Sequence, residues 1–173
     1  MPALLRDRQP VTNRRAAGLV LAVLVLLADQ GSKYWVLHGL HLQDGQVLVL
    51  APVLNFVLVW NHGITFGMFA GSGAKLGLVA IAAGVIICLG IWLWRSDTCL
   101  KSLAIGAIGG GAVGNVADRL HYGAVVDFIQ AHVGGYSWYV FNVGDSAIVC
   151  GVIALMVESL FARPPVAAQG GQR

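Results

Sequence analysis

The sequence predicts an α-helical membrane protein with four transmembrane helices. Of its 173 residues, 57% are hydrophobic and only 11% are charged, and the mean hydropathy is +0.75. Soluble globular domains carry about 25% charged residues, so this composition argues against a water-soluble enzyme, a disordered chain and a nucleic-acid-binding protein. Four apolar stretches approach the length of about 20 residues that a helix needs to cross a bilayer. They lie at residues 16–37, 76–94, 102–117 and 141–161.

The first span has a competing interpretation as a cleaved signal peptide, because Arg14 and Arg15 precede its apolar run. Three further spans and the lack of an A-x-A pattern at the end of the run favour a transmembrane helix. The second span contains no charged residue, whereas the third is short and rich in glycine. Its Gly106-x-x-x-Gly110-x-x-x-Gly114 spacing predicts close helix packing rather than a phosphate-binding loop.

The cations indicate how the chain is oriented in the membrane. Eight of the eleven Lys and Arg residues flank the spans on one side: Arg6, Arg8, Arg14, Arg15, Arg95, Lys101, Arg163 and Arg173. The positive-inside rule then places both termini in the cytoplasm. The basic pI of about 9.0 is therefore a signature of topology, and no nucleic-acid partner is needed to explain it. We expect one membrane domain over residues 1–162 and a disordered cytoplasmic tail over 163–173.

The segments outside the membrane are predicted to contain short strands. Residues 46–61 are rich in Val, Leu, Phe and Trp, which favours strands, with Pro52 at a strand boundary or edge. Residues 63–73 are apolar and rich in glycine, which favours a place in the membrane interface. Two more short strands are expected at 125–129 and 137–141, around a Gly-Gly turn.

Polar residues near the spans are the candidates for function, because a charged side chain at mid-bilayer costs roughly 2.5–3.5 kcal/mol. Half of the eight acidic residues lie at or near the outer ends of the spans: Asp29, Asp118, Asp127 and Asp145. Asp29 and Lys33 are four positions apart on one helix face and can pair. This pair is interpreted either as a structural ion pair or as a polar patch that faces a substrate.

The segment from Asn115 to Arg119 forms a second polar group, because residues three and four apart lie together on a helix. We expect Asp118 to pair with Arg119 or to cap the helix end. Arg119 could instead orient a carboxylate or a substrate carbonyl, since its planar guanidinium suits that task.

Asp127 and Asp145 are the candidate catalytic pair. Asp127 has apolar neighbours on both sides, whereas Asp145 could be an ordinary helix N-cap. Eighteen positions apart and joined by a turn, the two carboxylates can meet in space. Such a pair shares one proton, so one group can activate water while the other protonates a carbonyl. The result is peptide hydrolysis without a metal ion or cofactor, and the five histidines show no metal-binding spacing.

Two other classes of function remain open at this point. The acidic residues within the spans are also typical of proton relays, so a small proton-coupled transporter is an alternative. Four spans without an inverted repeat argue against it. A structural membrane subunit is the third possibility.

Five short blocks occur in the order found in one known family. They read Asp29-Gln30-x-x-Lys33, Asn61-x-Gly63, Gly114-Asn115-x-x-Asp118-Arg119, Val126-Asp127-Phe128 and Phe141-Asn142-x-x-Asp145. These blocks, together with the length and the four spans, resemble the bacterial lipoprotein signal peptidases (signal peptidase II). The resemblance extends from about residue 16 to residue 161. Two positions depart from the usual pattern: Gly144 stands where Ala is common, and Thr65 where Ala or Ser is common.

The resemblance implies an aspartic endopeptidase of the bacterial inner membrane, with its site near the outer face. Its partners would be membrane lipid and a prolipoprotein whose cysteine carries diacylglycerol, cleaved just before that cysteine, and it would act as a monomer. It implies an extracytoplasmic β-cradle and a short interfacial helix near residues 63–73. Asp127 and Asp145 would be catalytic. Residues that line or support the site would be Asn61, Gly63, Asn142, Arg119, Asn115, Asp118, Asp29 and Lys33.

Overall fold

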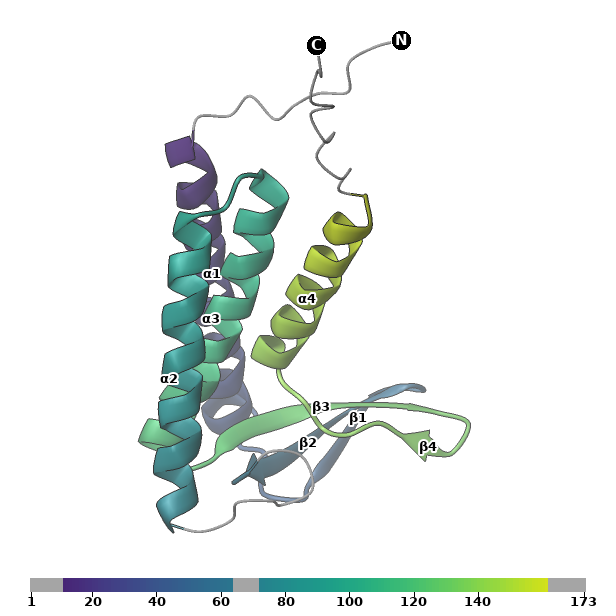
Figure 1. Ribbon diagram of the computed structural model, residues 1–173. Helices are drawn as coiled ribbons and strands as arrows, with labels where there is room; N and C mark the ends of the chain where they lie inside the picture. Colours follow the sequence, from purple (N-terminus) through teal and green to yellow (C-terminus); the bar gives the residue numbers. More distant parts are fainter. Residues whose placement is uncertain (1–10, 64–71, 162–173) are drawn as a thin grey trace, which may run out of the picture.

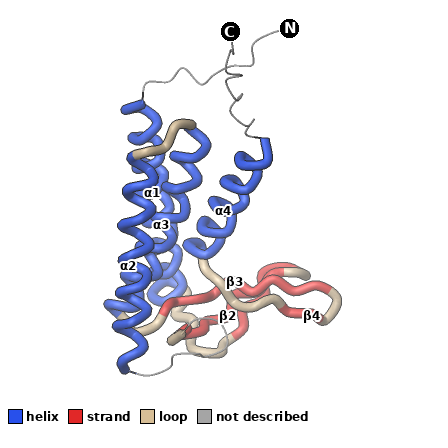
Figure 2. Tube along the Cα trace, in the orientation of Figure 1, coloured by secondary structure: helices blue, strands red, loops and turns tan. Residues whose placement is uncertain are grey.

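Four long helices and a small antiparallel sheet make up the computed structural model, which describes residues 11–63 and 72–161 (Figure 1). The helices are α1 (Val11–Tyr34), α2 (Ser72–Trp94), α3 (Cys99–His121) and α4 (Val143–Phe161). The strands are β1 (Val47–Ala51), β2 (Leu54–Asn61), β3 (Val125–Val133) and β4 (Tyr136–Ser137). The sheet lies across one end of the helical bundle, as the strands in Figure 2 show.

All four helices are long and apolar enough to cross a membrane, which confirms the predicted fold class. Their outward surfaces carry large apolar residues, such as Leu27, which is 63% exposed, and Ile87, which is 64% exposed. In lipid this exposure is favourable, because the acyl chains are as apolar as the side chains. A continuation of α1 as one turn of π-helix, Trp35–Gly39, leads toward the sheet.

The helix ends differ from the predicted spans where polar residues cap them. α3 was expected to end at residue 117, but it continues to His121 and so carries both Asp118 and Arg119 in its last turn. It begins at Cys99 because the Thr98 side chain accepts a hydrogen bond from the Lys101 amide at 3.1 Å. α4 begins at Val143, two residues later than expected, because Asn142 caps it.

α3 lies at the centre of the bundle and packs against the three other helices. A Cβ at Gly106 would overlap the carbonyl oxygen of Gly18, and one at Gly110 would overlap that of Ala22. On another face, Gly111 lies against the Gly144 carbonyl of α4. The predicted close packing of the glycine stripe is confirmed, since only residues without a side chain allow these backbones to touch.

The sheet has the order β1-β2-β3-β4, and all its neighbouring strands are antiparallel. The strands predicted in 46–61 are confirmed as a hairpin, with Pro52 in its turn. β3 is longer than predicted, and Trp60 pairs with Val126 across it. The strand predicted at 137–141 is confirmed only in part. Ser137 ends β4, and Phe141 forms a bridge with Ile129. Residues 138–140 are not in a strand, although the Trp138 amide donates to the Ala131 carbonyl at 2.7 Å.

A small apolar core joins the sheet to the end of α1. Val36, Leu42, Leu58, Val126 and Phe128 are all at most 5% exposed. This core holds β3 against the bundle. The interfacial helix expected near 63–73 and the tail expected at 163–173 fall largely or wholly outside the described residues.

The glycine contacts predict different effects for two neighbouring glycines of α3. Gly106→Ala should destabilise the fold by about 1–3 kcal/mol, the usual result of overpacking, because the new methyl meets the Gly18 backbone. Gly109→Ala meets no atom within 4 Å, so it should leave stability unchanged or raise it slightly through helix propensity. Unfolding of the two variants in detergent measures this difference, and equal stability would contradict the packing described.

Candidate functional site

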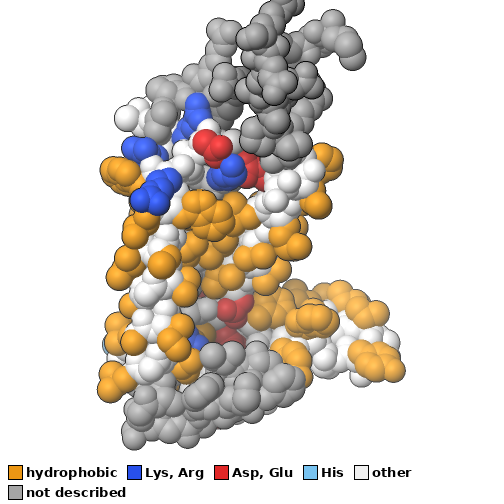
Figure 3. Space-filling view, viewed as in Figure 1, with side chains coloured by type: hydrophobic (Ala, Val, Ile, Leu, Met, Phe, Trp, Pro, Cys, Tyr) orange, Lys and Arg blue, Asp and Glu red, His pale blue; other side chains and the backbone are white. Residues whose placement is uncertain are grey.

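Two aspartates from different elements come together where the sheet meets the bundle. Asp127 lies on β3, opposite Val59 of β2, and Asp145 lies in the first turn of α4. Asn142 links them, because its side-chain nitrogen donates to Asp127 Oδ1 at 2.7 Å while its side-chain oxygen accepts from the Asp145 amide at 2.8 Å. Figure 3 shows acidic side chains in a hollow between α2 and α4, beside the sheet.

Asp127 is almost fully buried, with 2% of its surface exposed. Its neighbours Val126 and Phe128 lie in the apolar core. The side-chain amide of Asn61 donates to Asp127 Oδ2 at 3.0 Å. Burial raises the pKa of Asp127 to about 6, and the negative charge of Asp145 adds to the increase. The hydrogen bonds from Asn61 and Asn142 act in the opposite direction. Asp127 is therefore a carboxyl that can carry a proton close to neutral pH.

Asp145 is not the N-cap of α4, in contrast to the alternative considered from sequence. Asn142 is the cap, and Asp145 Oδ2 accepts from the Asn142 amide at 3.3 Å in return. This reciprocal arrangement is a capping box, in which each residue satisfies the other's backbone nitrogen. Asp145 Oδ1 accepts from the Asn115 amide at 2.8 Å. The capping box and Asn115 thus hold both carboxylate oxygens in place.

A buried ion-pair cluster lies next to the two aspartates. Lys33 Nζ is 2.7 Å from both Asp29 Oδ2 and Asp118 Oδ2, and all three side chains are at most 3% exposed. The predicted pairing of Asp29 with Lys33 is confirmed, whereas the expected pairing of Asp118 with Arg119 or with the helix end is wrong. Asp118 turns toward Lys33 because the lysine comes from α1, which packs directly against α3.

The carboxylates of this cluster accept hydrogen bonds from the backbone amides of the residues just before Asp127 and Asp145. Asp118 Oδ2 accepts from the Val126 amide at 3.1 Å, one residue before Asp127. Asp29 Oδ1 accepts from the Gly144 amide at 2.8 Å, one residue before Asp145. Gly144, which stands where Ala is common in the family, is buried, and its amide is hydrogen-bonded to Asp29 of α1.

Arg119 lies at the edge of the site. Its guanidinium donates to the Asn115 carbonyl at 3.3 Å and to the Gly63 carbonyl at 3.5 Å. Its Nε is buried and has no hydrogen-bond partner among the described residues. The Nε–H of Arg119 is therefore available to donate a hydrogen bond to the carbonyl oxygen of a bound substrate.

The structure brings together all the residues that the sequence singled out for the site, from α1, β2, α3, β3 and α4. One further residue, Gln30, was not among them. Its side-chain amide donates to Asp118 Oδ1 at 2.9 Å and to the Gly114 carbonyl at 3.3 Å. Its place beside Asp29 in the first block was the available signal. Within residues 11–63 and 72–161, no group of three or more His, Cys, Asp or Glu side chains could hold a metal ion.

Comparison with known proteins identifies the family to which this chain belongs. The family model described as signal peptidase (SPase) II matches residues 21–161. The lipoprotein signal peptidase of Rhodopseudomonas palustris (strain TIE-1) is 45% identical over 157 residues, which cover 87% of this chain and 96% of that protein. The lipoprotein signal peptidase of Nitrobacter hamburgensis is 47% identical over 158 residues, which cover 87% and 95%.

A solved structure agrees with this result. A bacterial membrane enzyme determined by the in meso method at 2.3 Å resolution superposes with a TM-score of 0.78 at 26% identity, covering 91% of this chain and 95% of that one. The match in sequence extends through all four helices and the sheet. This chain belongs to the signal peptidase II family of membrane peptidases.

Proposed function

We propose that this chain is an aspartic endopeptidase that removes the signal peptide from diacylglyceryl-modified prolipoproteins, cutting just before the lipidated cysteine. The observation that carries the proposal is the pair of Asp127, which is buried, and Asp145, which is half-buried, linked through Asn142 and held by amide donors. The names of its relatives support the substrate class.

The two carboxyl groups would share one proton, because two like charges at close range cannot both ionise at low cost. The ionised aspartate takes a proton from a water molecule as the water oxygen attacks the scissile carbonyl carbon. The protonated aspartate gives its proton to the carbonyl oxygen. Collapse of the tetrahedral intermediate then breaks the C–N bond, and the proton taken from water passes to the leaving amine of the cysteine. The dyad titrates as a pair, so either aspartate can hold the shared proton.

The surrounding residues would position this pair. Asn61, Asn115 and Asn142 donate to the carboxylates and keep the acceptor oxygens in fixed directions. Arg119, through its unpartnered Nε, would hold a substrate carbonyl near Gly63. The further supporting residues, Asp29, Lys33 and Asp118, lie behind the dyad and tie its two backbone segments together.

The proposed setting is the bacterial inner membrane, with both termini in the cytoplasm and the dyad near the outer face. Figure 3 supports this orientation, since Lys and Arg gather at the bundle end away from the sheet. A lipid-anchored cysteine lies at the membrane surface, where the dyad and water would both reach it. We also propose a single membrane domain over residues 1–162 that works as a monomer.

The substrate proposal predicts selectivity for the lipid. Purified protein should remove the signal peptide from a diacylglyceryl-modified prolipoprotein and leave the unmodified precursor intact, because the acyl chains anchor the scissile bond at the site. Gel mobility and mass spectrometry of the product measure the cleavage and its position. Equal cleavage of both precursors, or a cut elsewhere, would contradict the proposal.

The dyad proposal predicts that Asp127→Asn and Asp145→Asn each lower cleavage by at least about 10³-fold, since an amide can neither activate water nor supply the shared proton. Asp44→Asn, an exposed carboxylate outside the site, is the matched control and should keep wild-type activity. Retention of substantial activity by either dyad variant, in protein that folds, would exclude that residue from catalysis.

The raised pKa of Asp127 predicts a pH dependence of stability. The folded protein holds this proton up to about pH 6, whereas the ordinary value is 3.8. The contribution of Asp127 to stability is therefore complete below about pH 3.8 and is lost as the pH rises through 6. Relative to Asp127→Asn, wild-type protein should lose roughly 2–3 kcal/mol of unfolding free energy between pH 4 and 7. Chemical unfolding of both proteins across this pH range measures the loss. If the difference in unfolding free energy between them stayed constant with pH, the raised pKa of Asp127 would be contradicted.

A further inference from the structure

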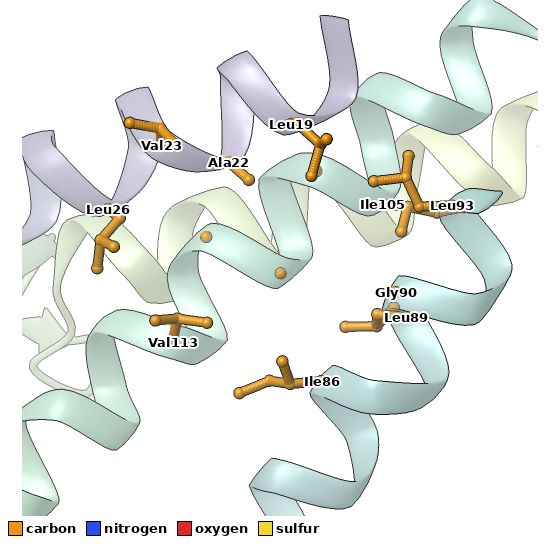
Figure 4. A pocket seen from close by; sticks show the side chains of 13 residues that line it. Leu19, Ala22, Val23, Leu26, Ile86, Leu89, Gly90, Leu93, Ile105 and Val113 are labelled. Carbon is orange, nitrogen blue, oxygen red and sulfur yellow. The ribbon is translucent and has the colours of Figure 1, made fainter. Parts of the chain in front are cut away.

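An apolar cavity lies between α1, α2 and α3, on the other side of α3 from α4 and Asp145. It encloses about 260 Å³ and is lined by apolar residues and glycines. Figure 4 shows Leu19 and Leu26 of α1, Leu89 and Gly90 of α2 and Val113 of α3 around it. α4, which carries Asp145, lines no part of it. This cavity is thus distinct from the catalytic candidate.

The dimensions of the cavity suit one acyl chain. Along α1 it extends from Leu19 to Leu26, which is about 10 Å at 1.5 Å per residue. One leaflet of the hydrocarbon core is about 15 Å deep, half of the full thickness. A 10 Å length of a partner's transmembrane helix, with a diameter of about 10–12 Å, would need roughly three times the cavity volume of about 260 Å³. A lipid chain that enters from the bilayer therefore fits better than protein.

Cations lie one turn beyond the end of the cavity that is remote from the sheet. Arg15 precedes Leu19 by four residues on α1, and its guanidinium stands over the Trp94 ring at 5.0 Å. The Arg15 Nε is buried without a hydrogen-bond partner among the described residues. A shallower hollow along α2 shares Gly90 with the cavity and ends at Trp94 and Arg95. The cavity and the hollow along α2 therefore each have an arginine at this end, Arg15 and Arg95.

The charge balance at this end favours an anion. Among the described residues it holds four cations, Arg14, Arg15, Arg95 and Lys101, and two carboxylates, Asp97 and Glu158, which gives a net charge of +2. Lys101 pairs with Asp97 at 2.7 Å and lies 3.8 Å from Glu158 of α4. The excess positive charge is therefore on the α1 and α2 side, where the cavity opens.

We propose that this cavity binds an acyl chain of an anionic phospholipid whose phosphate lies between Arg15 and Arg95. The second chain follows the hollow along α2. Arginine suits this task because its guanidinium donates two parallel hydrogen bonds to a phosphate, and basic sites between transmembrane helices are typical places for anionic headgroups. The bound lipid fills the space that α2 leaves beside α1 and α3.

Native mass spectrometry of the full chain in detergent tests the proposal with two probes of equal acyl chains, dioleoylphosphatidylglycerol and dioleoylphosphatidylcholine. We expect the anionic lipid to bind at least tenfold more tightly. Arg15→Gln should remove most of this preference. Lys101→Gln removes the same charge at the same end of the bundle and should retain it.

The cavity itself is tested by filling it. A Cβ at Gly90 or at Gly84 of α2 meets no atom within 4 Å, so the backbone accepts a side chain at both positions. Gly90 borders the cavity and Gly84 does not. Gly90→Leu should therefore lower binding of the anionic lipid at least tenfold, and Gly84→Leu should bind like wild type. Equal affinity of wild-type protein for the two lipids, or equal binding by the two leucine variants, would overturn the proposal, as would an unchanged preference in Arg15→Gln.

Discussion

The site depends on the pairing of Lys33 with two carboxylates inside the membrane domain. A buried charge is very costly unless it is paired and hydrogen-bonded. Lys33 forms ion pairs with Asp29 and Asp118, each at 2.7 Å. Gln30 donates a hydrogen bond to Asp118 at 2.9 Å. The cluster carries one excess negative charge, and backbone amides of Val126 and Gly144 donate to it. The same cluster of side chains thus neutralises the buried lysine and fixes the two backbone segments that carry Asp127 and Asp145.

The same lysine determines which way the neighbouring amides face. Asn115 Oδ1 accepts from Lys33 at 3.2 Å and from Asn142 at 3.1 Å. The Asn115 nitrogen is therefore left to face Asp145, as its 2.8 Å contact shows. Asn142 offers its oxygen to the Asp145 amide and so presents its nitrogen to Asp127. If either side-chain amide were reversed, buried polar groups would be left unpaired, which is costly in a low dielectric. Lys33 therefore fixes the orientation of Asn115 and Asn142, and through them the hydrogen bonds to Asp127 and Asp145.

Glycine on α3 serves two opposite purposes. Gly106, Gly110 and Gly111 allow the backbones of α1 and α4 to touch α3, which brings the polar residues of these helices within hydrogen-bond distance. Gly109, in contrast, has open space beside it and borders the apolar cavity. Gly106 and Gly110 also border this cavity, so closely packed and open positions lie next to each other on the helix, and lipid can complete the packing at the open ones.

Much of the fold follows from the sequence alone. The four spans were predictable because crossing a bilayer is a local requirement of length and apolarity, and the hairpin at 46–61 was predictable because strand residues and Pro52 stand in the right order. The ordered blocks of polar residues at the span ends contain the residues that the structure brings together around the two aspartates. Gln30 stands in the first block, but it was not predicted to belong to the site. Asp127 was distinctive because a lone carboxylate among apolar neighbours is costly unless the fold gives it a partner.

Other features depend on contacts between segments far apart in the chain, and only the tertiary structure decided them. Asp118 pairs with Lys33 rather than with its neighbour Arg119 because α1 packs against α3. Residues 138–140 are not a strand because the chain must leave β3 to begin α4, where Asn142 rather than Asp145 is the cap. The cavity between α1, α2 and α3 has no sequence pattern of its own, since it is the space left by packing. Hydropathy and local spacing act along the chain, whereas ion pairing, amide orientation and cavities arise only when helices meet.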